Sequence, residues 1–273
     1  MKDVNGKVAV VTGGGSGIGR GMALAFGNAG MRVVVADIDG DAAEKVGSEL
    51  RQSGAEAEAC ATDVIDRNSV ESLAERVYER FGAAHLLCNN AGVTTFETLE
   101  NCSDADWEWV LGVNLNGVIH GLQAFLPRMK AQAGEKHVVN TASAAGMQPY
   151  PFLGPYVATK YAVVGITETL RMEGKSWGLS ASVLCPGNVA TEIGRSGRNR
   201  HAHLGGNGGP IREDVIEALE RGLEPELVGR MVRDAVVRDD LYVFTHPEQR
   251  EEVAARFGRI LAAFDDIEKR GQE

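Results

Sequence analysis

The sequence predicts a single-domain α/β protein built on a doubly wound parallel sheet. Short runs of β-branched and apolar residues alternate with longer stretches of helical periodicity along the chain. The short runs are apolar on both faces, which is typical of strands covered by helices on both sides of a parallel sheet. The 273 residues contain no repeat, linker or low-complexity block, and an α/β fold of about 250 residues commonly forms one domain.

The predicted elements follow one another in a regular order. Strands are expected at residues 7–11, 32–36, 56–61, 85–88, 136–141, 180–185 and 241–244. Helices are expected at residues 17–29, 41–52, 66–81, 104–131, 155–177, 228–237 and 247–267. Residues 194–210 are different, because they hold six glycines and two histidines and show no hydrophobic period. We therefore expect a flexible substrate lid at about 192–222 and a C-terminal helical extension at about 247–273.

Composition argues against several classes of partner. The chain has 38 acidic and 28 basic residues, a net charge of −10, and no basic run, so neither nucleic acid nor an anionic membrane is expected as a partner. No apolar run approaches the ~18 residues of a membrane helix, and the polar start shows no signal-peptide core. We expect a cytoplasmic protein with a small-molecule substrate.

Cysteine and histidine give no sign of a metal site. The four cysteines form no C-x-x-C pair and have no histidine cluster beside them, so they are expected as reduced thiols. His201 and His203 lie in the irregular segment without a cysteine or carboxylate partner near them in the sequence. We expect these two histidines to be solvated loop residues rather than metal ligands.

A glycine-rich loop joins the first predicted strand to the first helix, as in a Rossmann fold. Glycine permits the tight turn and lets the backbone approach a pyrophosphate at the positive end of the helix. Asp37 closes the second strand 18 residues after the last loop glycine. A carboxylate there binds ribose hydroxyls and repels a 2′-phosphate, so NAD is favoured, with Arg20 as the one cation that would rescue NADP. The loop residues expected to bind cofactor are Gly13, Ser16, Gly17, Ile18 and Gly19.

Tyr156 and Lys160 form a candidate catalytic pair. They are four residues apart and share one helix face, and Lys160 is the only charge between residues 156 and 167. An ammonium group beside a phenol lowers the phenol pKa, as a base that deprotonates an alcohol requires. The alternative is a lysine that extends to solvent beside a core tyrosine.

The glycines follow the spacing G-x-x-x-G-x-G. With this spacing and several later motifs, the chain resembles the short-chain dehydrogenase/reductase family over roughly residues 6–192. The resemblance implies a catalytic tetrad of Asn114, Ser143, Tyr156 and Lys160, with Ala142 where the family often has a second serine. It also implies further cofactor contacts from Asp63, Val64, Asn90, Ala91, Gly92, Pro186, Gly187, Val189 and Thr191, of which the first two contact the adenine and the last four the nicotinamide carboxamide.

The resemblance implies a reversible hydride transfer between NAD and a secondary alcohol. Tyr156 would remove the alcohol proton, and Ser143 would hydrogen-bond the substrate oxygen. Lys160 would bind the nicotinamide ribose, and Asn114 would hold a water that passes the proton to solvent. Asn116 remains an alternative to Asn114. An NADP-dependent ketoacyl or other carbonyl reductase, or a non-catalytic NAD-binding scaffold, are the alternative functions.

The segments around the predicted site indicate a bulky, apolar or aromatic substrate without a charged anchor. The candidate pocket residues besides Ser143 are Phe96, Tyr150, Phe152, Leu153 and Asn188. Later segments loosely resemble bacterial family members that oxidise aryl alcohols, including the benzylic alcohols of lignin-type aryl ethers. Steroid, terpene and alicyclic alcohols remain alternatives.

Two predicted helical segments are apolar nearly all the way round. Residues 109–126 and 156–167 lack a charged face over most of their length. One side packs on the sheet, so the other needs a cover. We expect a homotetramer or homodimer joined through these helices; the alternative is that residues 247–273 fold back over them.

Overall fold

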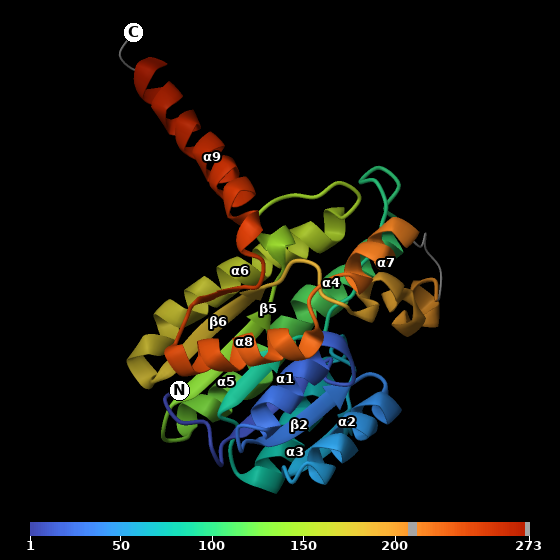
Figure 1. Cartoon of the computed structure of the whole chain (residues 1–273), viewed down its shortest axis with the longest axis vertical. Coiled ribbons are helices and arrows are strands. Elements are labelled where there is room, and N and C mark those ends of the chain that lie inside the picture. Colours follow the sequence, from blue (N-terminus) through green and yellow to red (C-terminus); the bar gives the residue numbers. More distant parts are fainter. Residues whose placement is uncertain (207–211, 271–273) are drawn as a thin grey trace.

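The computed structural model describes residues 1–206 and 212–270 and contains a seven-stranded parallel sheet (Figure 1). The strand order is β3-β2-β1-β4-β5-β6-β7. From β1 the chain winds toward one edge of the sheet through β2 and β3, and from β4 it winds toward the other edge, so the order switches between β1 and β4. Each predicted strand is confirmed to within one residue at either end. The strands are β1 (Val8–Thr12), β2 (Arg32–Asp37), β3 (Ala57–Ala61), β4 (Leu86–Asn89), β5 (Lys136–Thr141), β6 (Leu179–Cys185) and β7 (Tyr242–Phe244).

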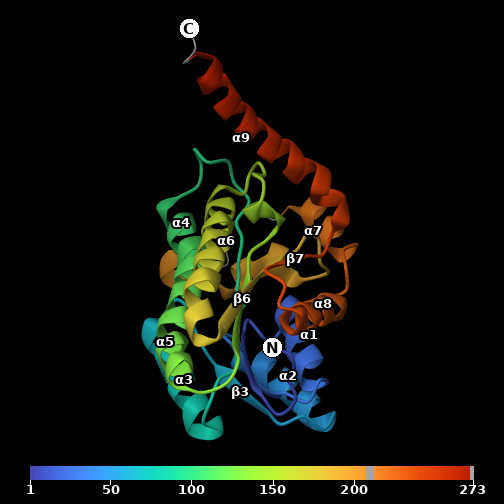
Figure 2. The same cartoon turned by 90° about the vertical axis from the view of Figure 1, so that its left-hand side faces the viewer.

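Helices cover both faces of the sheet (Figure 2). On one face, Met22, Phe26, Leu50 and Val232 pack into one buried cluster; the helices there are α1 (Gly17–Gly27), α2 (Gly40–Gln52) and α8 (Pro225–Arg238). The other face has a second buried cluster, which includes Trp109 and Phe125. The helices of that face are α3 (Arg67–Phe81), α4 (Asp104–Leu111), α5 (Gly117–Ala131) and α6 (Gly154–Gly174). The doubly wound prediction is therefore confirmed.

The single helix expected over residues 104–131 is interrupted. A π-helical turn, Gly112–Asn116, separates α4 from α5. Glycines at the start of this turn and just after it allow a close approach, because a Cβ on Gly117 would lie 2.9 Å from the Val64 side chain and one on Gly112 would lie 3.3 Å from Ile65. Single π-helical turns are frequent at functional sites, and this one contains Asn114.

The lid, residues 192–222, is more regular than its sequence indicates. Its described part contains the 3₁₀ turns Glu192–Asn199 and Ala202–Leu204 and helix α7 (Glu213–Glu220), which we did not predict. Residues 207–211 lie outside the described residues. The two ends of the lid are joined at its base, where Ala190 N–H donates to Leu223 O at 2.9 Å and Leu223 N–H donates to Asn188 O at 3.0 Å.

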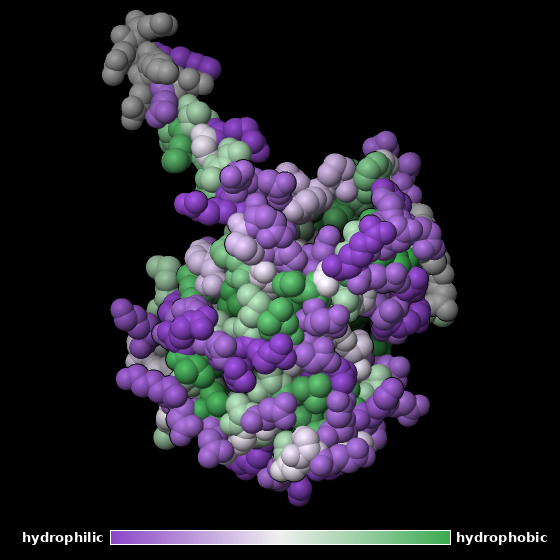
Figure 3. Space-filling model, viewed as in Figure 1, coloured by the Kyte–Doolittle hydropathy of each residue, from purple (hydrophilic) through white to green (hydrophobic). Residues whose placement is uncertain are grey.

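The C-terminal helix α9 (Arg250–Arg270) projects away from the body of the molecule (Figures 1 and 2). Apolar side chains in its outer part are open to solvent, with Leu261, Phe264 and Ile267 63–66% exposed. The space-filling view shows hydrophobic surface on the projecting helix (Figure 3). The helical prediction is confirmed. The alternative that this segment folds back over the predicted helices holds only at its start, where Val253 packs against the cluster that contains Val163 and Arg256 lies 4.9 Å from the Tyr161 ring centre on α6; the rest of its described part projects away (Figures 1 and 2). None of the described helices is both long and apolar enough to cross a membrane.

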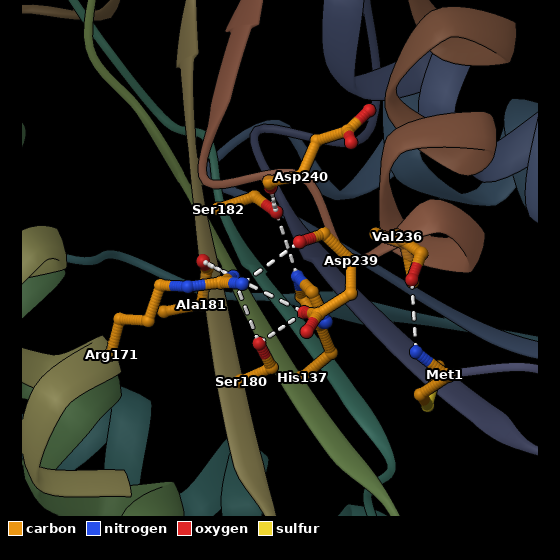
Figure 4. A network of polar contacts seen from close by, with 9 residues as sticks. All are labelled: Met1, His137, Arg171, Ser180, Ala181, Ser182, Val236, Asp239 and Asp240. Carbon is orange, nitrogen blue, oxygen red and sulfur yellow. Dashed lines mark hydrogen bonds and ion pairs between the residues drawn. The ribbon is translucent and has the colours of Figure 1, made fainter. Parts of the chain in front are cut away.

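A polar network fixes the turn between α8 and β7 (Figure 4). Arg171 donates to the Asp239 carboxylate at 3.1 Å and to its backbone oxygen at 2.8 Å. Nearby, His137 Nε2 lies 2.8 Å from Ser182 Oγ, and burial lowers the pKa of His137 to about 3. His137 is therefore a neutral core histidine, and the network holds the C-terminal strand against β6.

Candidate active site

A cavity of about 590 Å³ opens at the carboxyl ends of the strands, where the strand order reverses. In open α/β sheets this is where ligands bind. Most predicted site residues line the cavity, namely Gly13, Ser16, Gly17, Ile18, Asp37, Asp63, Val64, Asn90, Ala91, Gly92, Phe96, Ser143, Tyr150, Leu153, Tyr156, Lys160, Pro186, Gly187, Asn188, Val189 and Thr191. Gly19, Asn114 and Phe152 are not among its lining residues.

The glycine-rich loop is built by close backbone contacts. A Cβ on Gly19 would lie 2.0 Å from Gly13 O, and a Cβ on Gly13 would lie 2.8 Å from Ala91 Cα. Gly13 has a positive φ of 62°, a conformation that glycine adopts without strain. Ser16 precedes α1 but makes no side-chain capping bond. The helix N-terminus therefore faces the cavity with unpaired N–H groups, as phosphate binding requires.

Asp37 lies at the end of β2 and is held by backbone donors. Its two carboxylate oxygens accept from Gly15 N–H at 2.9 Å and from Asp39 N–H at 3.0 Å. Burial raises the pKa of Asp37, although both hydrogen bonds oppose the shift. Arg20, the cation considered for a 2′-phosphate, is instead bonded to Glu49 at 2.7 Å and to Glu226.

The structure shows a basic residue near Asp37 that sequence reasoning missed. Arg198, on the lid, lines the same cavity, and its charge partly offsets the effect of burial on the pKa of Asp37. No local sequence signal marks Arg198, because it is 161 positions from Asp37 along the chain.

Asp63 begins the segment after β3 and faces the lid. Its Oδ1 accepts from Ile65 N–H at 2.9 Å, and its Oδ2 lies 3.0 Å from His201 Nε2. His201 is half-buried, so the expectation of a fully solvated loop histidine is wrong: the lid folds onto the cavity. In the described residues there is no group of three or more side chains suited to hold a metal ion.

Tyr156 and Lys160 lie on α6 at the bottom of the cavity. Lys160 is 2% exposed, its Nζ donates to Thr141 O at 2.8 Å, and it lies 5.3 Å from the Tyr156 ring centre. Burial lowers the pKa of Lys160 to about 8 and raises the pKa of Tyr156. The expected lowering of the Tyr156 pKa is therefore wrong for this structure, because burial outweighs the opposing influence of Ser143.

Ser143 stands beside the phenol at the end of β5. The influence of its hydroxyl on the phenol partly opposes the rise of the Tyr156 pKa. Its Oγ also accepts from Ala145 N–H at 3.1 Å, so a short 3₁₀ turn orients the side chain. Ser143 and Tyr156 therefore present two neighbouring hydroxyl groups to the cavity.

Asn114 supports this pair from behind. Its Oδ1 accepts from Val93 N–H at 2.8 Å, and its Nδ2 donates to Val93 O at 2.9 Å and to Thr159 Oγ1 at 3.3 Å. A Cβ on Gly92 would lie 3.6 Å from both Asn114 Oδ1 and Lys160 Nζ, so the amide is close to the lysine. Both donors of the amide are used, whereas Oδ1 accepts one bond and keeps a second lone pair that can accept from a water. Asn116 is exposed, so the geometry favours Asn114.

The substrate end of the cavity is mostly apolar. Phe96, Leu153 and Ile193 line it as expected. Helix α7 adds Val215 and Leu219, which the sequence did not single out. Phe152 is instead 46% exposed, has a positive φ of 65°, and packs under Arg212 with the guanidinium 5.2 Å from its ring centre.

One acidic residue corrects the expectation of a pocket without a charged anchor. Glu252, in the first turn of α9, lines the cavity near Tyr150. The buried Gln148 donates from Nε2 to the Tyr150 hydroxyl at 2.5 Å and to the Glu252 carboxylate. Glu252 is about a hundred residues from its partners, so no local pattern could reveal it.

Comparison with known proteins agrees with this geometry. A family model described as short chain dehydrogenase matches residues 7–202. The C alpha-dehydrogenase of Sphingobium sp. (strain NBRC 103272 / SYK-6) is 37% identical over 273 residues, covering 98% of this chain and 90% of that protein. The cyclohexanol dehydrogenase of Acinetobacter sp. (strain SE19) is 36% identical over 190 residues, covering 69% of this chain and 75% of that protein.

Solved structures agree as well. The crystal structure of a short chain dehydrogenase/reductase from Burkholderia phymatum in complex with NAD has a TM-score of 0.93 and 38% identity, covering 96% of this chain and 97% of that one. The family model, the relatives and the shared fold support one conclusion: this chain belongs to the short chain dehydrogenase family.

Proposed function

We propose that the protein is an NAD-dependent dehydrogenase that oxidises bulky secondary alcohols and reduces the corresponding ketones. The observation that carries the proposal is the arrangement of Ser143, Tyr156 and Lys160 at the bottom of a cavity that begins at a glycine-rich loop. Two adjacent hydroxyl groups and a buried cation are what the transfer of an alcohol proton requires.

Each of these residues has a separate task in the proposed reaction. Ser143 hydrogen-bonds the carbinol oxygen, and Tyr156 takes the carbinol proton as its phenolate form. The buried Lys160, held by Thr141 O, favours the phenolate by its charge and passes the proton on toward solvent. The nicotinamide cofactor, when bound, supplies the acceptor for the hydride that leaves the carbinol carbon.

The cavity fits a dinucleotide along its length. Close glycine packing leaves the N-terminus of α1 open for a pyrophosphate, and Asp37 fits the hydroxyls of a ribose. We propose NAD rather than NADP because the Asp37 carboxylate would repel a 2′-phosphate. The relative from Burkholderia phymatum was crystallised with NAD. Arg198 is the feature that favours the alternative, an NADP-dependent carbonyl reductase.

The proposed substrate is an apolar or aromatic secondary alcohol. Phe96, Leu153, Val215 and Leu219 supply apolar walls, and the named relatives are a C alpha-dehydrogenase and a cyclohexanol dehydrogenase. The test is the formation of NADH, followed by absorbance, with benzylic, alicyclic, steroid and terpene alcohols. Benzylic alcohols should be oxidised fastest and NAD used far better than NADP; no turnover of any secondary alcohol with either cofactor would overturn the proposal.

We also propose a cytoplasmic homotetramer or homodimer. The four cysteines are free, which suits a reducing compartment. Exposed apolar side chains on α6, β7 and α9, such as Met172 at 79% and Phe264 at 64%, suit subunit contacts. Light scattering at low micromolar concentration should give about four times, or twice, the chain mass of 29.1 kDa; a single-chain mass would reject the oligomer.

A further inference from the structure

We infer that His201, on the lid, is a cofactor-binding residue that closes the adenine end of the cavity together with Asp63. The inference rests on the proposed function, since it takes the ligand of this cavity to be an adenine dinucleotide. It assigns the lid a task beyond covering the substrate.

Two anchors on the body fix the path of the lid on either side of the cavity. Ser196 Oγ accepts from Thr94 N–H at 3.1 Å and lies 3.3 Å from Thr94 O, and this contact is buried. Four residues later, Arg200 donates to the Asp106 carboxylate at 2.6 Å and stacks on the Trp109 ring at 5.1 Å. The Arg200 side chain is only 5% exposed. His201 follows directly, so its position is set by a buried contact rather than by a loose loop.

The imidazole of His201 lies against the carboxylate predicted to contact adenine. Its Nε2 is 3.0 Å from Asp63 Oδ2, while the other carboxylate oxygen accepts from Ile65 N–H. A carboxylate offers about four lone-pair sites, so Asp63 can bond both residues and still accept from an exocyclic amino group. The contact with His201 is therefore compatible with a bound purine.

The second ring nitrogen of His201 has no hydrogen-bond partner among the described residues, and a ligand could supply one. Its Nδ1 is buried and has no hydrogen-bond partner within residues 1–206 and 212–270. Buried polar atoms are nearly always bonded in folded proteins. Val64, Ile65 and Asn199 line the same cavity as His201, and they give apolar surface for a flat ring and polar atoms for its edge. A purine has both features.

The position of His201 also connects the two ends of the cavity. Ile193, at the substrate end, and His201, at the adenine end, belong to one lid segment and are eight positions apart. A lid that served the substrate alone would have no need to contact Asp63. Binding of adenosine beneath His201 would therefore also order the wall that receives the alcohol.

The test substitutes His201 and its neighbour His203 in turn and measures how each change affects the binding of the two halves of the cofactor. His203 stacks on His201 with ring centres 5.4 Å apart but is itself exposed, so His203→Ala is the matched control. Dissociation constants for AMP, nicotinamide mononucleotide and NAD are measured by calorimetry on the full chain. We expect His201→Ala to raise the dissociation constants of AMP and NAD about tenfold and to leave that of nicotinamide mononucleotide unchanged. The control should stay within about twofold for all three ligands.

A conservative variant separates contact from folding. His201→Gln retains a donor in place of Nε2, so it should recover part of the AMP affinity while the thermal midpoint of all variants stays that of the parent. Unchanged or tighter AMP binding by His201→Ala would overturn the inference, as would an equal loss for the mononucleotide. If the unsubstituted protein binds neither NAD nor NADP, the proposed function itself fails, and this inference fails with it.

Discussion

The cavity has a floor and a roof that are built in different ways. The floor consists of the strand ends and the start of α6, with the glycine-rich loop, Asn114, Ser143, Tyr156 and Lys160. The roof consists of the lid and the first turn of α9. Floor side chains are held by the backbone, as in the bonds of Lys160 to Thr141 O at 2.8 Å and of Asn114 to Val93 at 2.8 Å. Several roof side chains are instead held by other side chains, such as Arg200 by Asp106 and His201 by Asp63.

This difference separates reaction from recognition. A group that is buried and bonded to the backbone keeps one position whatever ligand enters, so the floor suits the chemical step. A contact between two side chains is altered by exchanging either partner, so the roof suits the choice of ligand. Substitutions in the floor should therefore remove turnover, and those in the roof should change affinity and selectivity.

The largest effect is expected from Tyr156, the proposed catalytic base in the floor of the cavity. Tyr156→Phe should lower kcat by about 10²-fold or more, because the proton acceptor is lost while the ring remains. NAD affinity, measured by calorimetry, should stay unchanged. Tyr161→Phe, one turn further along α6, is the control and should keep normal turnover. If the Tyr156→Phe enzyme retained its turnover, the assignment of Tyr156 as the proton acceptor would be contradicted.

The pH dependence of the reaction gives the next effect. Burial raises the pKa of Tyr156, so at neutral pH the phenol is mostly protonated and phenolate forms as pH rises. Alcohol oxidation should therefore increase with pH, by up to about tenfold per pH unit while Lys160, whose pKa is about 8, keeps its charge, and the rate of ketone reduction should not increase. Initial rates in both directions over a pH series provide the measurement. An oxidation rate independent of pH would show that the phenolate is not the base.

The cofactor end of the floor should give a smaller change. Asp37→Ala removes the group that repels a 2′-phosphate, so the preference for NAD over NADP should narrow by about tenfold. Arg198 is already close enough to influence Asp37, and it would then face the phosphate. The ratio of kcat/KM for the two cofactors is the readout, with the exposed Asp41→Ala as control. Equal use of both cofactors by the unsubstituted enzyme would refute the assigned selectivity.

The smallest effect should come from the roof. Glu252→Gln keeps the shape but removes the carboxylate that accepts from Gln148. KM should rise a few-fold for aryl alcohols that carry a ring hydroxyl and stay constant for their unsubstituted analogues, since an exposed carboxylate contributes little. Glu248→Gln removes the same charge from the same wall and should have no such selectivity. A loss of kcat on all substrates would place Glu252 in the floor instead.

The two regions also differ in how well the sequence predicted them. Strand positions and the residues that follow them were accessible, because β-branched runs and glycine spacing are local signals. Gly13, Asp37, Asn90 and Tyr156 accordingly line one cavity. The π-helical turn at Gly112–Asn116 was missed, since it depends on how closely the glycines at its ends approach the segment after β3.

The roof depends on contacts between distant segments, which single-sequence patterns do not contain. Helix α7 was missed within a glycine-rich stretch, Phe152 was placed in the pocket although it is exposed, and Glu252 was overlooked. The sign of the Tyr156 pKa shift was also wrong. The neighbouring lysine is visible in the sequence, but the desolvation that raises the phenol pKa appears only in the packed structure.

The hydrogen bonds that join the two ends of the lid determine how far the length and sequence of the lid can vary. Ala190 and Leu223 are hydrogen-bonded to each other, and a Cβ on Gly222 would lie only 2.4 Å from Asn188 O, so the segment leaves and re-enters the sheet domain at one point. The entropy of closing such a loop grows slowly, by about 0.6 kcal/mol for each doubling of its length. The segment can therefore be exchanged as a cassette, lengthened or shortened between relatives, while the hydride-transfer machinery beneath it is inherited intact.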